Sequence, residues 1–172
     1  GLIKSLLPNS QVIYCKRNAL DTCLSIFFSN FPSTANDIPS SIPLHGIQIE
    51  DEINNTHSYH MNAFSYDLLD IGKKYLEHEK IMAHWKNIFP DDIYELNYEE
   101  LILDQEKISR ELINYISLEW DPECLNFYKN KRGVKTTSYL QVRKPIYSSS
   151  VGRWKKYREY LKPLILLLKN TK

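Results

Sequence analysis

Residues 12–31 read VIYCKRNALDTCLSIFFSNF, and this stretch decides the fold. It opens with a short apolar run, residues 12–15, of the kind that forms a buried strand. Lys16 and Arg17 follow at once, and apolar residues then recur at the spacing of a helix. The stretch therefore predicts a core strand that turns at an arginine and continues into the amino end of a helix.

The start of this helix is marked by polar residues. Asn18 is a residue type that caps the first amide groups of a helix, and Asp21 lies three positions later, as in a capping box. The apolar residues that follow share one helical face. They are Leu20, Cys23, Leu24, Phe27, Phe28 and Phe31.

The junction between strand and helix suits an anion. Unpaired amide groups and the helix dipole favour negative charge at the amino end of a helix. Arg17 adds a planar fork of donors that matches phosphate oxygens. Ser25 lies about two helical turns further on, so its hydroxyl reaches the same anion if the helix leans over it. The alternative is an ordinary charged strand end followed by an ordinary helix serine.

Composition excludes several classes of protein. The chain has 172 residues, 42% of them hydrophobic and 25% charged, which fits one soluble domain or part of one. The net charge of +1 argues against a bulk nucleic-acid binder, so any anion site must be local. No apolar run reaches the length needed to span a membrane.

The spacing of the cysteines and glycines argues against several kinds of structural and binding site. The three cysteines, Cys15, Cys23 and Cys124, include no close pair, which argues against a disulfide framework or a zinc knuckle. Cys15 and Cys23 fall on apolar patterns and are expected to be small buried side chains in a reducing compartment. The five glycines are scattered, so neither a Walker-type phosphate loop nor a dinucleotide fingerprint is present.

The rest of the chain reads as helices, turns and one more strand. Residues 32–62 form a polar stretch without periodicity, and His57 and His60 within it are expected to be solvated rather than metal ligands. Gly72 marks either a helix break or a close contact, and Pro163 either divides the last helix or begins a new turn. Strands are predicted at residues 11–15 and 93–98, and helices at residues 2–7, 18–30, 65–87, 104–116, 121–127 and 154–169.

Four segments together resemble one family. They are the strand–arginine–helix unit with Ser25, residues 97–101 (NYEEL), residues 138–145 (SYLQVRKP) and residues 150–154 (SVGRW). In this order they resemble the carboxy-terminal two-thirds of a sulfotransferase. The branch that they resemble most includes the tyrosylprotein sulfotransferases and the bacterial tetratricopeptide-linked sulfotransferases.

The resemblance implies a fold and a reaction. The fold would be a partial P-loop NTPase-like α/β sulfotransferase fold, with a few-stranded parallel sheet flanked by helices. The sulfate donor would be 3′-phosphoadenosine 5′-phosphosulfate (PAPS), without a metal. The acceptor would carry a hydroxyl, on a peptide tyrosine, a carbohydrate or a small molecule. Bacterial relatives imply a cytoplasmic location, whereas a eukaryotic source would imply the Golgi lumen.

The resemblance also implies roles for individual residues. Arg17 and Ser25 would hold the 3′-phosphate of the donor, and Tyr98 would lie against the nucleotide. Arg153 would stand where the family places a cation near the phosphates. The adenosine side would be lined by Ser138, Tyr139, Leu140 and Gln141.

The departures from the family lead to further expectations. The strand and loop that wrap the 5′-phosphosulfate, and the general base that follows them, are expected to lie upstream of Gly1. Residues 1–172 are therefore expected to form one partial domain, with a polar insertion at about residues 32–62, that does not transfer sulfate alone. A catalytically inactive module that binds a nucleotide or a partner is the alternative. A small nucleotide kinase is disfavoured, because no lysine-bearing phosphate loop occurs and the QVRKP run at residues 141–145 argues against this class of enzyme.

Overall fold

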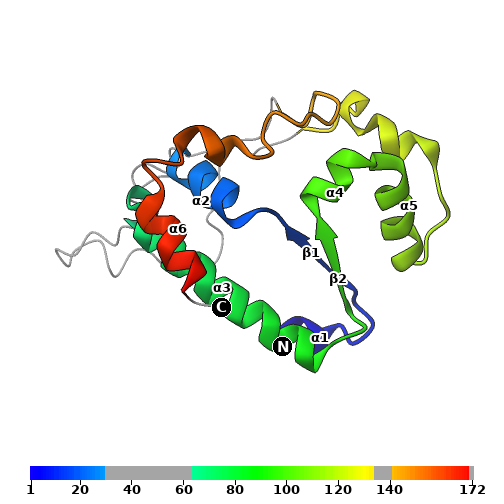
Figure 1. Cartoon of the computed structure of the whole chain (residues 1–172). Helices are drawn as coiled ribbons and strands as arrows, with labels where there is room; N and C mark the ends of the chain where they lie inside the picture. The colour runs from blue at the N-terminus through cyan, green and yellow to red at the C-terminus, as the bar shows by residue number, and fades with distance from the viewer. Residues whose placement is uncertain (30–62, 134–140, 171–172) are drawn as a thin grey trace, which may run out of the picture.

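The computed structural model describes residues 1–29, 63–133 and 141–170, and these form an α/β fold (Figure 1). The polar stretch and both of its histidines lie outside the described residues. The strands are β1 (Val12–Lys16) and β2 (Ile93–Asn97). The α-helices are α1 (Leu2–Leu6), α2 (Ala19–Phe27), α3 (Leu68–Ile88), α4 (Tyr98–Leu103), α5 (Gln105–Tyr115) and α6 (Lys162–Lys169). The 3₁₀ helices are η2 (Ala63–Tyr66), η3 (Pro122–Lys129) and η4 (Arg153–Tyr157).

The two strands pair in parallel, with Val12 opposite Ile93 and Lys16 opposite Asn97. Parallel strands present their carboxyl ends at the same edge of a sheet. The chain therefore leaves β1 and β2 side by side and enters α2 and α4 at neighbouring positions (Figure 1). This register places the residues that follow the two strands next to each other.

The prediction that β1 is buried was wrong. The strand alternates between half-buried and exposed residues, Ile13 is 40% exposed, and Cys15 is exposed. Successive side chains of a strand point to opposite faces of the sheet. Tyr14 faces α3, where its hydroxyl contacts Glu79, so Ile13 and Cys15 point to the face that the described residues leave more open.

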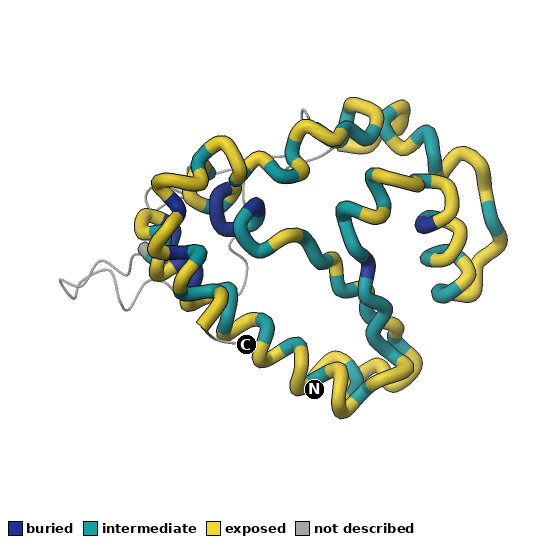
Figure 2. The backbone as a smooth tube through the Cα atoms, viewed as in Figure 1, coloured by how far each residue is buried: buried dark blue, intermediate teal, exposed yellow. Residues whose placement is uncertain are grey.

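The core lies where α2, α3, η4 and α6 meet (Figure 2). Gly72 does not break α3; a side chain there would meet Leu164 at 2.5 Å and Leu167 at 2.9 Å, so the close-contact alternative is the right one. The buried residues of this cluster are Cys23, Leu24, Ile71, Leu161 and Leu164.

The last predicted helix is two helices. Residues 154–169 divide into η4 and α6, and Pro163 lies in the first turn of α6. Proline is tolerated there because the amide group that it lacks has no partner within the helix. The segment after α5 returns across the molecule, so η4 contacts α2 (Figure 1). In the described part of the chain, no helix is long and apolar enough to cross a membrane.

Candidate functional site

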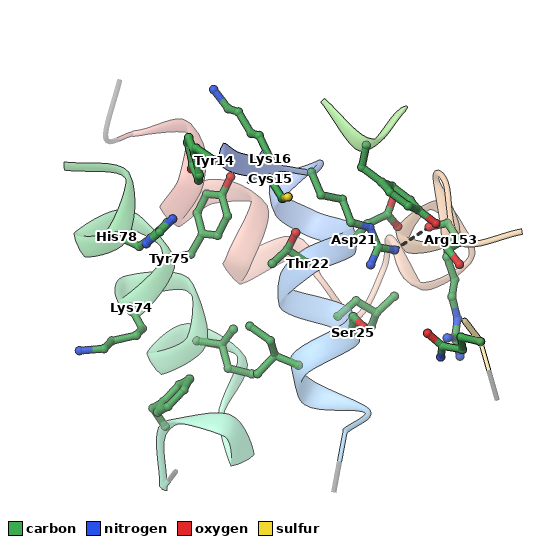
Figure 3. A pocket seen from close by; sticks show the side chains of 18 of the residues that line it. Tyr14, Cys15, Lys16, Asp21, Thr22, Ser25, Lys74, Tyr75, His78 and Arg153 are labelled. Atoms are coloured by element: carbon green, nitrogen blue, oxygen red, sulfur yellow. Dashed lines mark hydrogen bonds between the residues drawn. The ribbon is translucent and has the colours of Figure 1, made fainter. Parts of the chain in front are cut away.

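A cavity of about 660 Å³ opens at the carboxyl end of β1 (Figure 3). Its walls come from the β1–α2 junction, from α3, from the start of α4 and from residues 141–154, which we call the returning segment. Volumes of this size are typical of small-molecule sites. The cavity therefore lies where the sequence predicts an anion to bind.

Most of the predicted site residues line this one cavity. Ser138, Tyr139 and Leu140 lie outside the described residues. The structure brings the others together from both strand ends, from α2 and from the returning segment. They are Arg17, Ser25, Tyr98, Gln141 and Arg153.

Arg17 is held at the edge of the cavity by main chain and by an aromatic ring. One terminal nitrogen donates to the carbonyl of Ser150 at 2.8 Å, and the guanidinium carbon lies 5.3 Å from the centre of the Tyr98 ring. Among the described residues it has no carboxylate partner, and its buried Nε has no hydrogen-bond acceptor. A buried donor without an acceptor is costly, which fits an anion that completes the site.

Only one part of the predicted cap at the amino end of α2 is present. The Asn18 side chain accepts from the amides of Leu20 at 3.1 Å and Asp21 at 3.2 Å, which confirms the N-cap. The main-chain amide of Asn18, however, donates to Glu99 at 2.9 Å. The capping box with Asp21 was therefore wrong, because the carboxylate of Glu99, in the first turn of α4, takes its place.

Asp21 has a different role, which the sequence analysis missed. It is 2% exposed, and its carboxylate accepts from the amides of Gly152 at 2.6 Å and Trp154 at 2.9 Å. Helical neighbours four residues apart share a face, so the positions of Asp21 and Ser25 were a signal that Asp21 also faces the site. Its partners on the returning segment could not be read from that spacing.

Two cationic groups in the cavity wall lack a carboxylate partner in the described part of the chain, namely Arg17 and Arg153. The Arg153 guanidinium lies 4.9 Å from the centre of the Phe28 ring. Lys16 instead pairs with Glu95 at 3.2 Å. The guanidinium groups are thus the cations of this wall that are open to an anion.

The opposite side of the cavity is aromatic. Figure 3 shows Tyr14, Tyr75 and His78 on the α3 side of α2, with Arg153 on the other side. The Tyr14 hydroxyl donates to Glu79 at 2.5 Å, and the ring meets His78 edge-on at 5.5 Å. Burial and, next, the hydrogen bond to Glu79 raise the pKa of Tyr14, and burial with the nearby Glu79 raises the pKa of Tyr75 to about 12. Both phenols therefore stay protonated.

Histidines and acids of the described ranges do not gather into a metal site. No group of three or more His, Cys, Asp or Glu side chains that could hold a metal occurs among them. His84 is exposed and meets the Trp85 ring edge-on at 4.9 Å. The three cysteines are free, Cys23 being buried and Cys124 exposed.

Comparisons with known proteins agree with this architecture. A sequence model described as "Sulfotransferase family" matches residues 1–122. The chain is 39% identical over 168 residues to an uncharacterized protein of Aquifex aeolicus (strain VF5). That match covers 98% of this chain and 19% of the relative, so the chain spans about a fifth of the relative's length. No solved structure matches the chain.

Proposed function

The chain belongs to the sulfotransferase family, and from this premise we propose that its cavity binds the 3′-phosphate and adenosine side of PAPS. The reaction would move a sulfuryl group to the hydroxyl of an acceptor. The observation that carries the proposal is the gathering of Arg17, Ser25, Tyr98, Gln141 and Arg153 around one cavity. In this proposal, residues 1–172 form one part of a sulfotransferase domain, with residues 32–62 as an insertion, in a cytoplasmic protein.

The 3′-phosphate would lie between Arg17, Ser25 and Arg153. Arg17 supports this role because its buried Nε lacks an acceptor among the described residues and its guanidinium has no competing carboxylate there. Ser25 is exposed on the same cavity wall, so its hydroxyl is available as a donor. Guanidinium groups bind phosphate oxygens with charge-assisted hydrogen bonds, which are stronger than neutral ones.

The adenosine would lie along the edge formed by Tyr98 and Gln141. Tyr98 follows β2 directly, and its ring is already contacted by the Arg17 guanidinium. A ring fixed in this way is a suitable surface for a base to stack on. Ser138, Tyr139 and Leu140 belong to this part of the proposal through the family resemblance.

The catalytic contribution of these residues would be positioning. PAPS, when bound, supplies the sulfuryl group and a phosphate leaving group. Arg17 and Arg153 would fix the nucleotide so that an acceptor hydroxyl can approach in line, and fixed donors would offset negative charge. The aromatic side formed by Tyr14, Tyr75 and His78 suits an acceptor that carries a hydroxyl. The general base is not assigned.

Isothermal titration calorimetry tests the proposal. The chain should bind adenosine 3′,5′-bisphosphate more tightly than adenosine 5′-phosphate, because only the former carries the 3′-phosphate. Equal affinities would refute the proposed site. A catalytically inactive nucleotide-binding module is the second candidate, because the same cavity residues could hold a nucleotide without transferring a group from it. Sulfate transfer from PAPS by the natural protein would exclude that second candidate.

A further inference from the structure

We propose that Asp21 is a positioning residue for the donor site, and this inference rests on the function proposed above. Its carboxylate holds the turn before η4 against α2, so that the Ser150 carbonyl accepts from Arg17 and Arg153 lines the cavity. Asp21 would not bind the nucleotide itself, because its carboxylate and the phosphates are both negatively charged. It would act through the cations that it places.

The geometry of the turn supports this role. Gly152 and Trp154 donate their amides to different oxygens of Asp21, and Arg153 lies between them in the chain. Two fixed neighbours limit the directions in which the Arg153 side chain can leave the backbone. Gly152 has a φ of 67°, a left-handed conformation that glycine adopts without strain. The turn is therefore shaped to meet the carboxylate.

The burial of Asp21 also requires an explanation. Its side chain is 2% exposed, and in the described ranges it forms no ion pair. A buried carboxylate is costly unless it is hydrogen-bonded, and two amide donors supply that compensation. An apolar residue would pack there without this cost but could not hold the turn. The carboxylate is thus what links the turn to α2.

The Asp21→Asn substitution separates positioning from simple electrostatics. The two amides now donate to different oxygens of Asp21, and in Asn one of those two positions becomes an NH₂ group, which cannot accept. Removal of a negative charge near the cavity should strengthen phosphate binding if only charge matters. If Asp21 acts by holding the turn, its replacement should weaken phosphate binding. The two accounts therefore predict changes of opposite sign.

The experiment measures the ratio of the dissociation constants for adenosine 5′-phosphate and adenosine 3′,5′-bisphosphate. In the full chain, Asp21→Asn should lower this ratio about tenfold, the effect of losing one hydrogen bond to a charged group. Asp70→Asn, which removes an exposed carboxylate paired with Lys73 on α3, should leave it unchanged. A ratio that is unchanged or higher in folded Asp21→Asn would overturn the role of Asp21 alone. A wild-type ratio of one would overturn this inference together with the proposed function.

Hydrogen exchange of the wild-type chain provides a second readout that does not depend on a variant folding. Adenosine 3′,5′-bisphosphate should slow exchange of the Gly152 and Trp154 amides more than adenosine 5′-phosphate does. This result is expected because a phosphate held by Arg153 would stabilise the turn that Asp21 anchors. Equal protection of these amides by the two nucleotides would contradict the inference.

Discussion

The Arg17 guanidinium donates a hydrogen bond of 2.8 Å to the Ser150 carbonyl, although the two residues lie 133 positions apart in the chain. Arg17 directly follows the first strand, and Ser150 precedes the 3₁₀ helix near the end of the chain. The bond therefore closes the site between distant parts of the sequence. It also leaves the other donors of Arg17 available for a ligand, because no carboxylate partner for them occurs in the described residues.

The first prediction concerns Ser25. Ser25→Ala should weaken binding of adenosine 3′,5′-bisphosphate by up to about 1.5–3 kcal/mol, the range for hydrogen bonds to charged groups, and by less than Arg17→Ala does. Calorimetry with adenosine 5′-phosphate should show little change. Ser29→Ala is the matched control, since the Ser29 hydroxyl donates to the Ser25 carbonyl and does not line the cavity. An unchanged affinity in Ser25→Ala would remove that serine from the site.

The second prediction concerns Gly72, where α3 approaches α6. Gly72→Val should lower the free energy of unfolding by about 1–3 kcal/mol, because overpacking forces the Leu164 and Leu167 side chains to move. Urea denaturation measures this change. Gly133→Ala is the control, since no atom lies within 4 Å of a side chain added there. A valine variant as stable as the wild type would show that the helices do not meet at Gly72.

The third prediction concerns Cys23 and pH. Burial raises the pKa of the Cys23 thiol from 9.0 to about 12. Because the folded pKa lies above the unfolded one, this group's contribution to stability is complete below pH 9 and declines as the pH rises toward 12. In the folded protein, alkylation of Cys23 should be about a thousandfold slower than that of an unperturbed thiol, from its smaller thiolate fraction alone.

Mass spectrometry after brief treatment with iodoacetamide at pH 8 checks the thiol prediction. Cys15 and Cys124 are exposed and should be labelled, and Cys23 should be labelled only after denaturant is added. Comparable labelling of Cys23 and Cys15 in native buffer would contradict the burial of Cys23.

The sequence was most informative where structure is decided locally. Helical spacing and the Asn18 cap predicted α2, and the alternating run before Asn97 predicted β2. The family resemblance then selected five described residues that do line one cavity. Their roles as donor ligands stay predictions.

The sequence was least informative where structure depends on distant parts of the chain. The partners of Asp21 lie 131 and 133 residues away, and nothing in the spacing of α2 indicates them. The exposure of Cys15 depends on what covers the second face of β1, which an apolar pattern does not report. The break before Pro163 was one of two alternatives that the sequence left open, and the contact of η4 with α2 joins segments far apart in the chain.

The most direct test of the central claim is the affinity of Arg17→Ala for two nucleotides. The account predicts that this variant loses about 3 kcal/mol or more of binding free energy for adenosine 3′,5′-bisphosphate, the sum of two charge-assisted hydrogen bonds, and much less for adenosine 5′-phosphate. Arg110→Ala, on α5 and outside the cavity, should bind both nucleotides as the wild type does. Equal losses of affinity for the two nucleotides in Arg17→Ala would contradict the claim that this arginine binds the 3′-phosphate.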